Sequence, residues 1–183
     1  VQLGKLGVQS IVNSMGVFVS AAFAAVNRID DFAYMPQQNI AHAMTALMAQ
    51  NKGAKKTDRI KAAFRCGMKI ELFYGIFIFF VCFFLAHPLM QLFSNDPVVC
   101  KHGVTYLKLI SLMYLFPAVT NGVQGYFRGI GDLKITLISS FVNMSVRVIF
   151  AAVLVFHFSL QIEALPFSYL AGWIGMLLAE VPL

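Results

Sequence analysis

The chain has 183 residues, of which 59% are hydrophobic and 12% are charged, whereas soluble domains carry roughly 45–50% apolar and about 25% charged residues. This composition excludes an ordinary soluble domain and indicates an integral membrane protein, with the lipid bilayer as its surroundings. The formal net charge of +6 does not indicate a nucleic-acid partner, because the basic residues cluster between two apolar runs.

Long runs without Asp, Glu, Lys or Arg follow one another along the chain. They cover residues 6–27, 32–51, 72–95, 109–127, 135–146, 148–162 and 164–179, and only Arg147 separates the fifth run from the sixth. A helix needs about 20 mostly apolar residues to cross a bilayer core, and it satisfies its backbone hydrogen bonds within itself. The sequence therefore predicts an all-α, polytopic membrane helix bundle with about six transmembrane helices.

A strongly basic segment predicts the orientation of the bundle. Seven bases lie between residues 52 and 69 with only Asp58 to oppose them: Lys52, Lys55, Lys56, Arg59, Lys61, Arg65 and Lys69. Loops rich in Lys and Arg stay in the cytoplasm. Alternation then places the connection 128–134 inside as well, and the connections 91–100 and 157–163 outside.

The segment NRIDDFAYMPQQN, residues 27–39, interrupts the apolar pattern and has two interpretations. It could be an external loop between two helices, or a charged stretch inside one membrane helix. On one helix, Arg28 and Asp31 stand at i, i+3 and could form a buried ion pair. Residues at i, i+4, i+7 and i+8 would form a polar stripe that faces a cavity or another helix, namely Asp30, Tyr34, Gln37 and Gln38. Whether Asp30 and Asp31 act in ion coupling or only hold helices together stays open.

Other polar residues in the runs are interpreted as structural. Arg147 lies in the middle of a predicted helix and must point inward, as a buried structural charge like Arg28. We expect Glu71 at the membrane interface, and Glu180 near the cytoplasmic face.

The sequence offers no pattern for catalysis, metal binding or a cofactor. Cys66, Cys82 and Cys100 are widely spaced and form no metal or redox motif. No nucleophile with an adjacent base is recognisable either, so we expect no enzyme, no metal site and no cofactor.

Three segments together resemble the multidrug and toxic compound extrusion (MATE) transporters. They are AAFAAVNRIDDFAYMPQQNIAHAMTALMAQNKGA (21–54), LFSNDPVV (92–99) and GYFRGIGDLKITLISSFVNMSVRV (125–148). The resemblance implies two six-helix lobes around a central cavity. It places residues 1–183 in the C-terminal lobe, with the end of helix seven at 1–13 and helix eight at about 21–51. Helices nine to twelve follow at about 60–90, 100–124, 134–157 and from 164. The first helix would be truncated and the N-terminal lobe, a required partner, would be missing.

The same resemblance implies a function and favours the helical interpretation of residues 27–39. It implies a secondary active transporter of the cell membrane that exports drugs or other small organic, often cationic compounds in exchange for H+ or Na+. For its location we expect the bacterial inner membrane. The coupling ion is not assigned, because the carboxylates that Na+-coupled members carry on helices seven and ten have no counterpart in 1–15 or 102–124. The alternative is a flippase for lipid-linked precursors, which would need a more cationic cavity than Arg28 and Arg147 provide against Asp30 and Asp31.

Overall fold

A computed structural model describes residues 2–157, 162 and 164–180, with side chains from residue 7 onward. In this part of the chain there are eight helices and no strand, which confirms the predicted all-α bundle. The helices are α1 (Gln2–Asn13), α2 (Val17–Gly53), α3 (Thr57–Phe84), α4 (Ala86–Gln91), α5 (Pro97–Ser111), α6 (Leu115–Gly129), α7 (Leu133–Phe156) and α8 (Ala164–Glu180).

Helix α2 runs without a break through the charged segment 27–39. Its 37 residues include Arg28, Asp30 and Asp31 in the N-terminal half. Pro36 also lies inside the helix. The hypothesis of an external loop at these residues is therefore wrong, and the hypothesis of one charged helix is confirmed. The helix can keep Asp30 and Asp31 because both line a polar cavity of the bundle, as described below.

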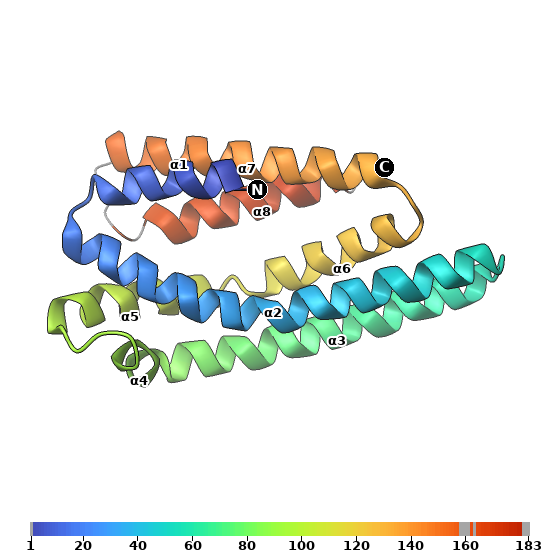
Figure 1. The fold of residues 1–183 in the computed structure, drawn as a ribbon, viewed down its shortest axis with the longest axis horizontal. Coiled ribbons are helices and arrows are strands. Elements are labelled where there is room, and N and C mark those ends of the chain that lie inside the picture. The colour runs from blue at the N-terminus through green and yellow to red at the C-terminus, as the bar shows by residue number, and fades with distance from the viewer. Residues whose placement is uncertain (1, 158–161, 163, 181–183) are drawn as a thin grey trace.

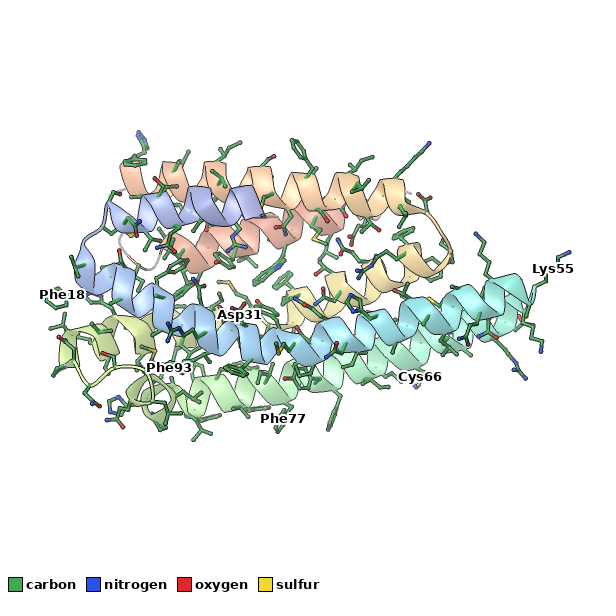
Figure 2. The ribbon with its side chains drawn as sticks, in the orientation of Figure 1. Phe18, Asp31, Lys55, Cys66, Phe77 and Phe93 are labelled. Atoms are coloured by element: carbon green, nitrogen blue, oxygen red, sulfur yellow. The ribbon has the colours of Figure 1, made fainter. Side chains whose placement is uncertain are left out.

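The helices form two groups, as Figure 1 shows. Helices α1, α7 and α8 lie side by side, with α7 packed along most of α8. Helix α2 packs on α3, α5 and α6, and α3 also packs on α6. Fewer contacts join the groups, chiefly those of α6 with α7 and α8 and of α1 with α2. The space between the two groups is where the candidate site lies.

The predicted helix at 100–124 is broken into α5 and α6, whose axes differ by 52°. Pro117 is the third residue of α6 and has no N–H to donate to the Met113 carbonyl, so a regular helix cannot continue through this point. The Phe116 N–H donates instead to Met113 at 3.0 Å, one residue closer than in an α-helix. The break places Tyr114 at the N-cap of α6.

Two helices, α3 and α7, are long and apolar enough to cross a bilayer, and the bent pair α5–α6 makes a third if it is one span. Fewer helices meet this criterion of length and hydropathy than the six transmembrane helices predicted, because some are too polar or too short. Helix α2 is long enough but carries charges and amides at its centre, and α8 is apolar but has only 17 residues. Large apolar side chains on the outer faces of the two long helices are exposed, for example Phe73 and Phe77 on α3 and Leu137 and Phe141 on α7, as expected for surfaces in contact with lipid.

The connections also agree with the predicted alternation. The α2–α3 turn and the α6–α7 turn lie at the same end of the bundle in Figure 1, and the Lys52 ammonium donates to the Ile130 carbonyl. The α4–α5 connection lies at the opposite end. There Asp96 caps α5 by accepting hydrogen bonds from the N–H groups of Val98 and Val99, at 2.8 and 3.2 Å.

Candidate functional site

A polar cavity of about 250 Å³ lies between the two groups of helices. Four helices line it: α2 with Asn27, Asp30, Asp31, Tyr34 and Gln38; α6 with Pro117, Thr120, Asn121 and Gln124; α7 with Ser140, Asn143, Met144 and Arg147; and α8 with Tyr169, Trp173 and Met176. We call this the central cavity. Its lining combines two carboxylates, one guanidinium, several amides and aromatic rings, so it can hold a polar or charged guest that has apolar parts.

The predicted polar stripe of α2 divides between the cavity and the helix interior. Asp30, Tyr34 and Gln38 line the central cavity together with Asp31. Gln37, the fourth member of the stripe, is not among the lining residues and is only 1% exposed. The stripe therefore faces inward as predicted, but Gln37 packs against neighbouring helices and not against the cavity.

Asp30 is held by a residue from the α5–α6 break. The Tyr114 hydroxyl donates a hydrogen bond to Asp30 Oδ1, and both side chains are buried. The ring of Tyr114 also meets the ring of Tyr34 edge-on, with centroids 5.7 Å apart. A residue at the break between α5 and α6 thus holds the carboxylate at the cavity wall.

Arg147 points inward from α7, as predicted, and brings a positive charge into the cavity. Its guanidinium carbon lies 3.1 Å from the centroid of the Tyr169 ring, a cation–π contact. The ring of Tyr169 is in turn 5.9 Å from that of Trp173. A smaller adjoining cavity of about 200 Å³ is lined by Asp31, Arg147 and Tyr169 as well, so these three residues stand where the two spaces meet.

The prediction that Arg28 is a buried structural charge is wrong for the chain described here. Arg28 is exposed and belongs to neither of these two cavities. It shares a face of α2 with Phe32 and Met35, at i, i+4 and i+7, and both of these are exposed as well. Asp30 is buried on another side of the helix, whereas Asp31, three residues after Arg28, is exposed and lines both cavities.

Two further acids have buried side chains. Glu71, predicted at the membrane interface, is 0% exposed, and Glu180 is 4% exposed. Glu71 is buried because it stands on the face of α3 that carries Gly67 and Gly75, two small residues that bring neighbouring helices close. Burial between helices does not give the level of a residue in the bilayer, so the placement of Glu71 at the membrane interface stays a prediction.

Several residues of the site were not singled out from the sequence. Tyr114, Asn143, Tyr169 and Trp173 were treated as parts of apolar runs. A usable signal existed for α7, because Ser140, Asn143 and Arg147 stand at i, i+3 and i+7 and so share one face. Tyr169 and Trp173 stand at i, i+4 on α8. Nothing local in the sequence indicates that Tyr114 reaches Asp30, 84 positions away.

No metal site is apparent in the part of the chain that the structure describes, where no three His, Cys, Asp or Glu side chains gather. All three cysteines are free thiols, Cys66 on the surface and the other two buried.

Fold and cavity together define a polytopic helical membrane bundle with a charged cavity of about 250 Å³ inside it. The sequence profile of one family, described as MatE, matches residues 1–153, and the chain belongs to this family.

Curated relatives and solved structures agree with this assignment. The chain is 25% identical over 150 residues to the probable multidrug resistance protein NorM of Thermotoga maritima, a match that covers 81% of this chain and 31% of the relative. It is 27% identical over 176 residues to the probable multidrug resistance protein YoeA of Bacillus subtilis, covering 96% and 36%. A match of 26% over 121 residues, covering 64% and 27%, is to a protein of Shewanella oneidensis named FAD transporter. The chain thus spans about a third of the length of these relatives.

The fold is that of solved MATE structures. A crystal structure of MATE in the bent conformation aligns with a TM-score of 0.91 at 12% identity, covering 97% of this chain and 40% of that one. An inward-facing multidrug resistance MATE transporter of the MOP superfamily aligns with a TM-score of 0.85 at 16% identity, covering 98% and 42%. At these identities the likeness establishes the fold alone.

Proposed function

We propose that this chain is the C-terminal lobe of a secondary active exporter of the bacterial inner membrane. In this proposal the whole protein exchanges H+ or Na+ for drugs or other small organic, often cationic compounds. Family membership and the names of the curated relatives support the class of transporter. The share of those relatives that the chain covers is consistent with a second lobe as the partner that completes the transport path.

The observation that carries the proposal is the charge of the central cavity. Two carboxylates, Asp30 and Asp31, face it, and Arg147 is the one base among its lining residues. An organic cation would gain from the excess of negative charge and from the faces of Tyr169 and Trp173. Met144 and Met176 add flexible, polarizable surface that adapts to apolar parts of different shape.

Antiport follows from competition for the same carboxylates. A buried carboxylate is stable when a proton, a metal cation or an organic cation neutralises it, and costly when none does. If the coupling ion and the substrate cation neutralise Asp30 or Asp31 in turn, release of one favours binding of the other. In this scheme Asp30 and Asp31 bind the ion or the substrate, Tyr34 and Gln38 orient it, and Arg147 limits the total negative charge.

The test is efflux of a fluorescent organic cation from cells that express the full-length parent protein. Asp30→Asn and Asp31→Asn each remove one charge with little change of shape. We expect both to reduce efflux per amount of protein in the membrane, over a series of pH values and Na+ concentrations. Asp58→Asn, which changes an exposed acid at the start of α3, is the matched control and should export like the parent. Unchanged efflux in both cavity variants would rule out these carboxylates as the coupling groups.

The alternative function, flipping of a lipid-linked precursor, is less compatible with this cavity. A pyrophosphate head group needs several bases, and Arg28 lies outside the cavity, which leaves Arg147 facing two acids. Binding of a lipid-linked pyrophosphate to the purified parent protein, weakened by Arg147→Gln and not by Asp30→Asn, would favour the flippase instead.

A further inference from the structure

Glu71 is a buried acid that the proposed transport site does not use. Its side chain is 0% exposed, and neither carboxyl oxygen has a hydrogen-bond partner among the described residues. A second polar side chain, Gln37 on α2, is in the same condition: it is 1% exposed, and neither its amide nitrogen nor its amide oxygen has a partner. Buried polar groups are almost always hydrogen-bonded, so two such side chains require an explanation.

The packing of α2 against α3 places these two residues opposite each other. The helices are antiparallel, and the Tyr74 hydroxyl of α3 donates to the Ala33 carbonyl of α2 at 3.2 Å. On the other side, Gly67 of α3 faces the Met44 side chain of α2. Gln37 lies one turn after Ala33 on α2, and Glu71 lies one turn after Gly67 on α3. Both residues therefore lie between the Tyr74–Ala33 contact and the Gly67–Met44 contact, in the same buried interface.

Helix α6 closes the site from the third side. A Cβ at Gly75 of α3 would lie 3.2 Å from the Cβ of Ala118, and Gly122 faces the Met68 side chain, so the level of Glu71 falls near Thr120 of α6. A Cβ at Gly125 would lie 2.9 Å from the Ala41 carbonyl oxygen of α2, which puts Gln37, one turn earlier, at the level of Asn121. Gln37, Glu71 and the pair Thr120–Asn121 therefore share one level of a tightly packed three-helix interface.

We propose that Glu71 is a proton-binding site at this α2–α3–α6 interface, with Gln37 as its hydrogen-bonding partner, separate from Asp30 and Asp31. An ionised carboxylate without a counter-charge would be very costly here. A protonated carboxyl offers one O–H donor and a free carbonyl oxygen. These complement the carbonyl and the NH2 of an amide, so a change of rotamer in the two unpartnered side chains would let the neutral acid and Gln37 satisfy each other.

The titratable and charged groups of the packed helices stand at other levels. On α2, Tyr34 and Asp30 lie one and two turns toward the N-terminus from Gln37. On α3 itself, Tyr74 is the nearest titratable side chain, at i+3 from Glu71, and its hydroxyl donates to the Ala33 carbonyl, whereas Arg65 and Lys69 are exposed. Farther from this level lie, among others, exposed His42 of α2, Tyr114 and Arg128 near the two ends of α6, Lys108 of α5 over the Phe83 ring, and exposed His87 of α4. A bare metal cation takes about six oxygen ligands, whereas the Glu71 carboxyl and the Gln37 amide together supply three. A proton needs no further ligand, so it is the ion that best neutralises Glu71 here.

The site is one layer of side chains away from the central cavity. Thr120 and Asn121 line that cavity, and Gln38 lines it next to Gln37. A proton can reach Glu71 from the cavity when the Gln37 and Asn121 side chains change rotamer. The relevance of this step to export rests on the function proposed above, but the existence of the proton site does not.

Infrared difference spectra of the purified full-length parent protein test the site without any transport. We expect a band from a protonated carboxyl at neutral pH that is lost in Glu71→Gln and kept in Asp58→Asn. Gln37→Leu should shift this band to the position of a carboxyl without a hydrogen bond, and transfer to D2O should shift it in the folded protein. If Glu71→Gln removes no such band, Glu71 is ionised and the proposal is wrong.

Two further outcomes would overturn particular parts of the proposal. Loss of the band on addition of Na+ at constant pH would make this a sodium site, and an unchanged band in Gln37→Leu would remove Gln37 from it. Efflux of the fluorescent cation gives a separate readout, in which Glu71→Gln should weaken export driven by a pH gradient. A parent protein that exports no cation would count against the proposed function and leave the spectroscopic result standing.

Discussion

The Tyr114 hydroxyl donates a hydrogen bond to the Asp30 carboxylate, and this contact joins the break between α5 and α6 to the charged centre of α2. Because Pro117 prevents a regular helix here, Tyr114 begins a new helix at an angle of 52° to the preceding one. The acid at the cavity wall is therefore positioned by an irregularity in a different helix.

Tyr114→Phe should lower the free energy of unfolding by about 1–3 kcal/mol, because it leaves a buried acceptor without this donor. The measurement is a denaturant titration of the full-length parent protein in detergent. Tyr34→Phe is the matched control, since the Tyr34 hydroxyl is buried close by and has no hydrogen-bond partner. Equal effects of the two substitutions would mean that the Tyr114–Asp30 bond contributes nothing to stability.

Arg147→Lys should behave differently from Arg65→Lys. Lysine keeps the charge at position 147 but cannot stack a planar guanidinium on the Tyr169 ring, so we expect a loss of about 0.5–2 kcal/mol in stability and reduced efflux. Arg65 is exposed on α3, and its replacement should change neither. A double-mutant cycle with Tyr169→Leu isolates the contact, and a coupling energy near zero would show that the ring does not hold the guanidinium.

Gly125→Ala should destabilise the bundle by about 1–3 kcal/mol, because it overpacks a closed interface. The added Cβ would lie 2.9 Å from the Ala41 carbonyl oxygen, and backbone cannot move aside as a flexible side chain can. Gly53→Ala at the end of α2 adds the same methyl group where no atom lies within 4 Å. Thermal unfolding of both variants provides the comparison, and a Gly125→Ala protein as stable as the parent would show that α2 and α6 can separate without loss.

The orientation predicted from the basic run can be tested with single cysteines. In a full-length parent protein without native cysteines, Asn95→Cys should react with an impermeant thiol reagent added to whole cells, and Lys56→Cys should react only after the cells are opened. The two positions lie in connections at opposite ends of the bundle (Figure 1). Labelling of Lys56→Cys in whole cells, with none of Asn95→Cys, would reverse the orientation.

The 183-residue chain expressed alone should not confer drug efflux. Alternating access requires two repeats or bundles that move around a site between them, and the chain spans about a third of the length of its curated relatives. The measurement is efflux of the fluorescent cation from cells that make the chain, compared with cells that make the full-length parent. Efflux by the chain at the rate of the parent would contradict this expectation.

The sequence by itself determined the class of the fold and much of its division into helices. Apolar runs, the basic segment and turn residues are local features, so they predict helices and their order without knowledge of packing. The resemblance carried by three segments decided that residues 27–39 lie within one helix, a point that charge patterns left open. Spacing on that helix then placed Asp30, Tyr34 and Gln38 on a common inward side.

Only the tertiary structure decided which of these charges are buried and what they meet. Arg28 was predicted inside but shares an exposed face with Phe32 and Met35, and the side chain of Glu71, whose burial the sequence did not predict, is fully buried. Tyr114 and Asp30 lie 84 positions apart and come together only because the α5–α6 break turns one helix toward another. Helical periodicity tells which residues share a face, whereas burial depends on which neighbouring helix covers that face, and that is a property of the packed bundle.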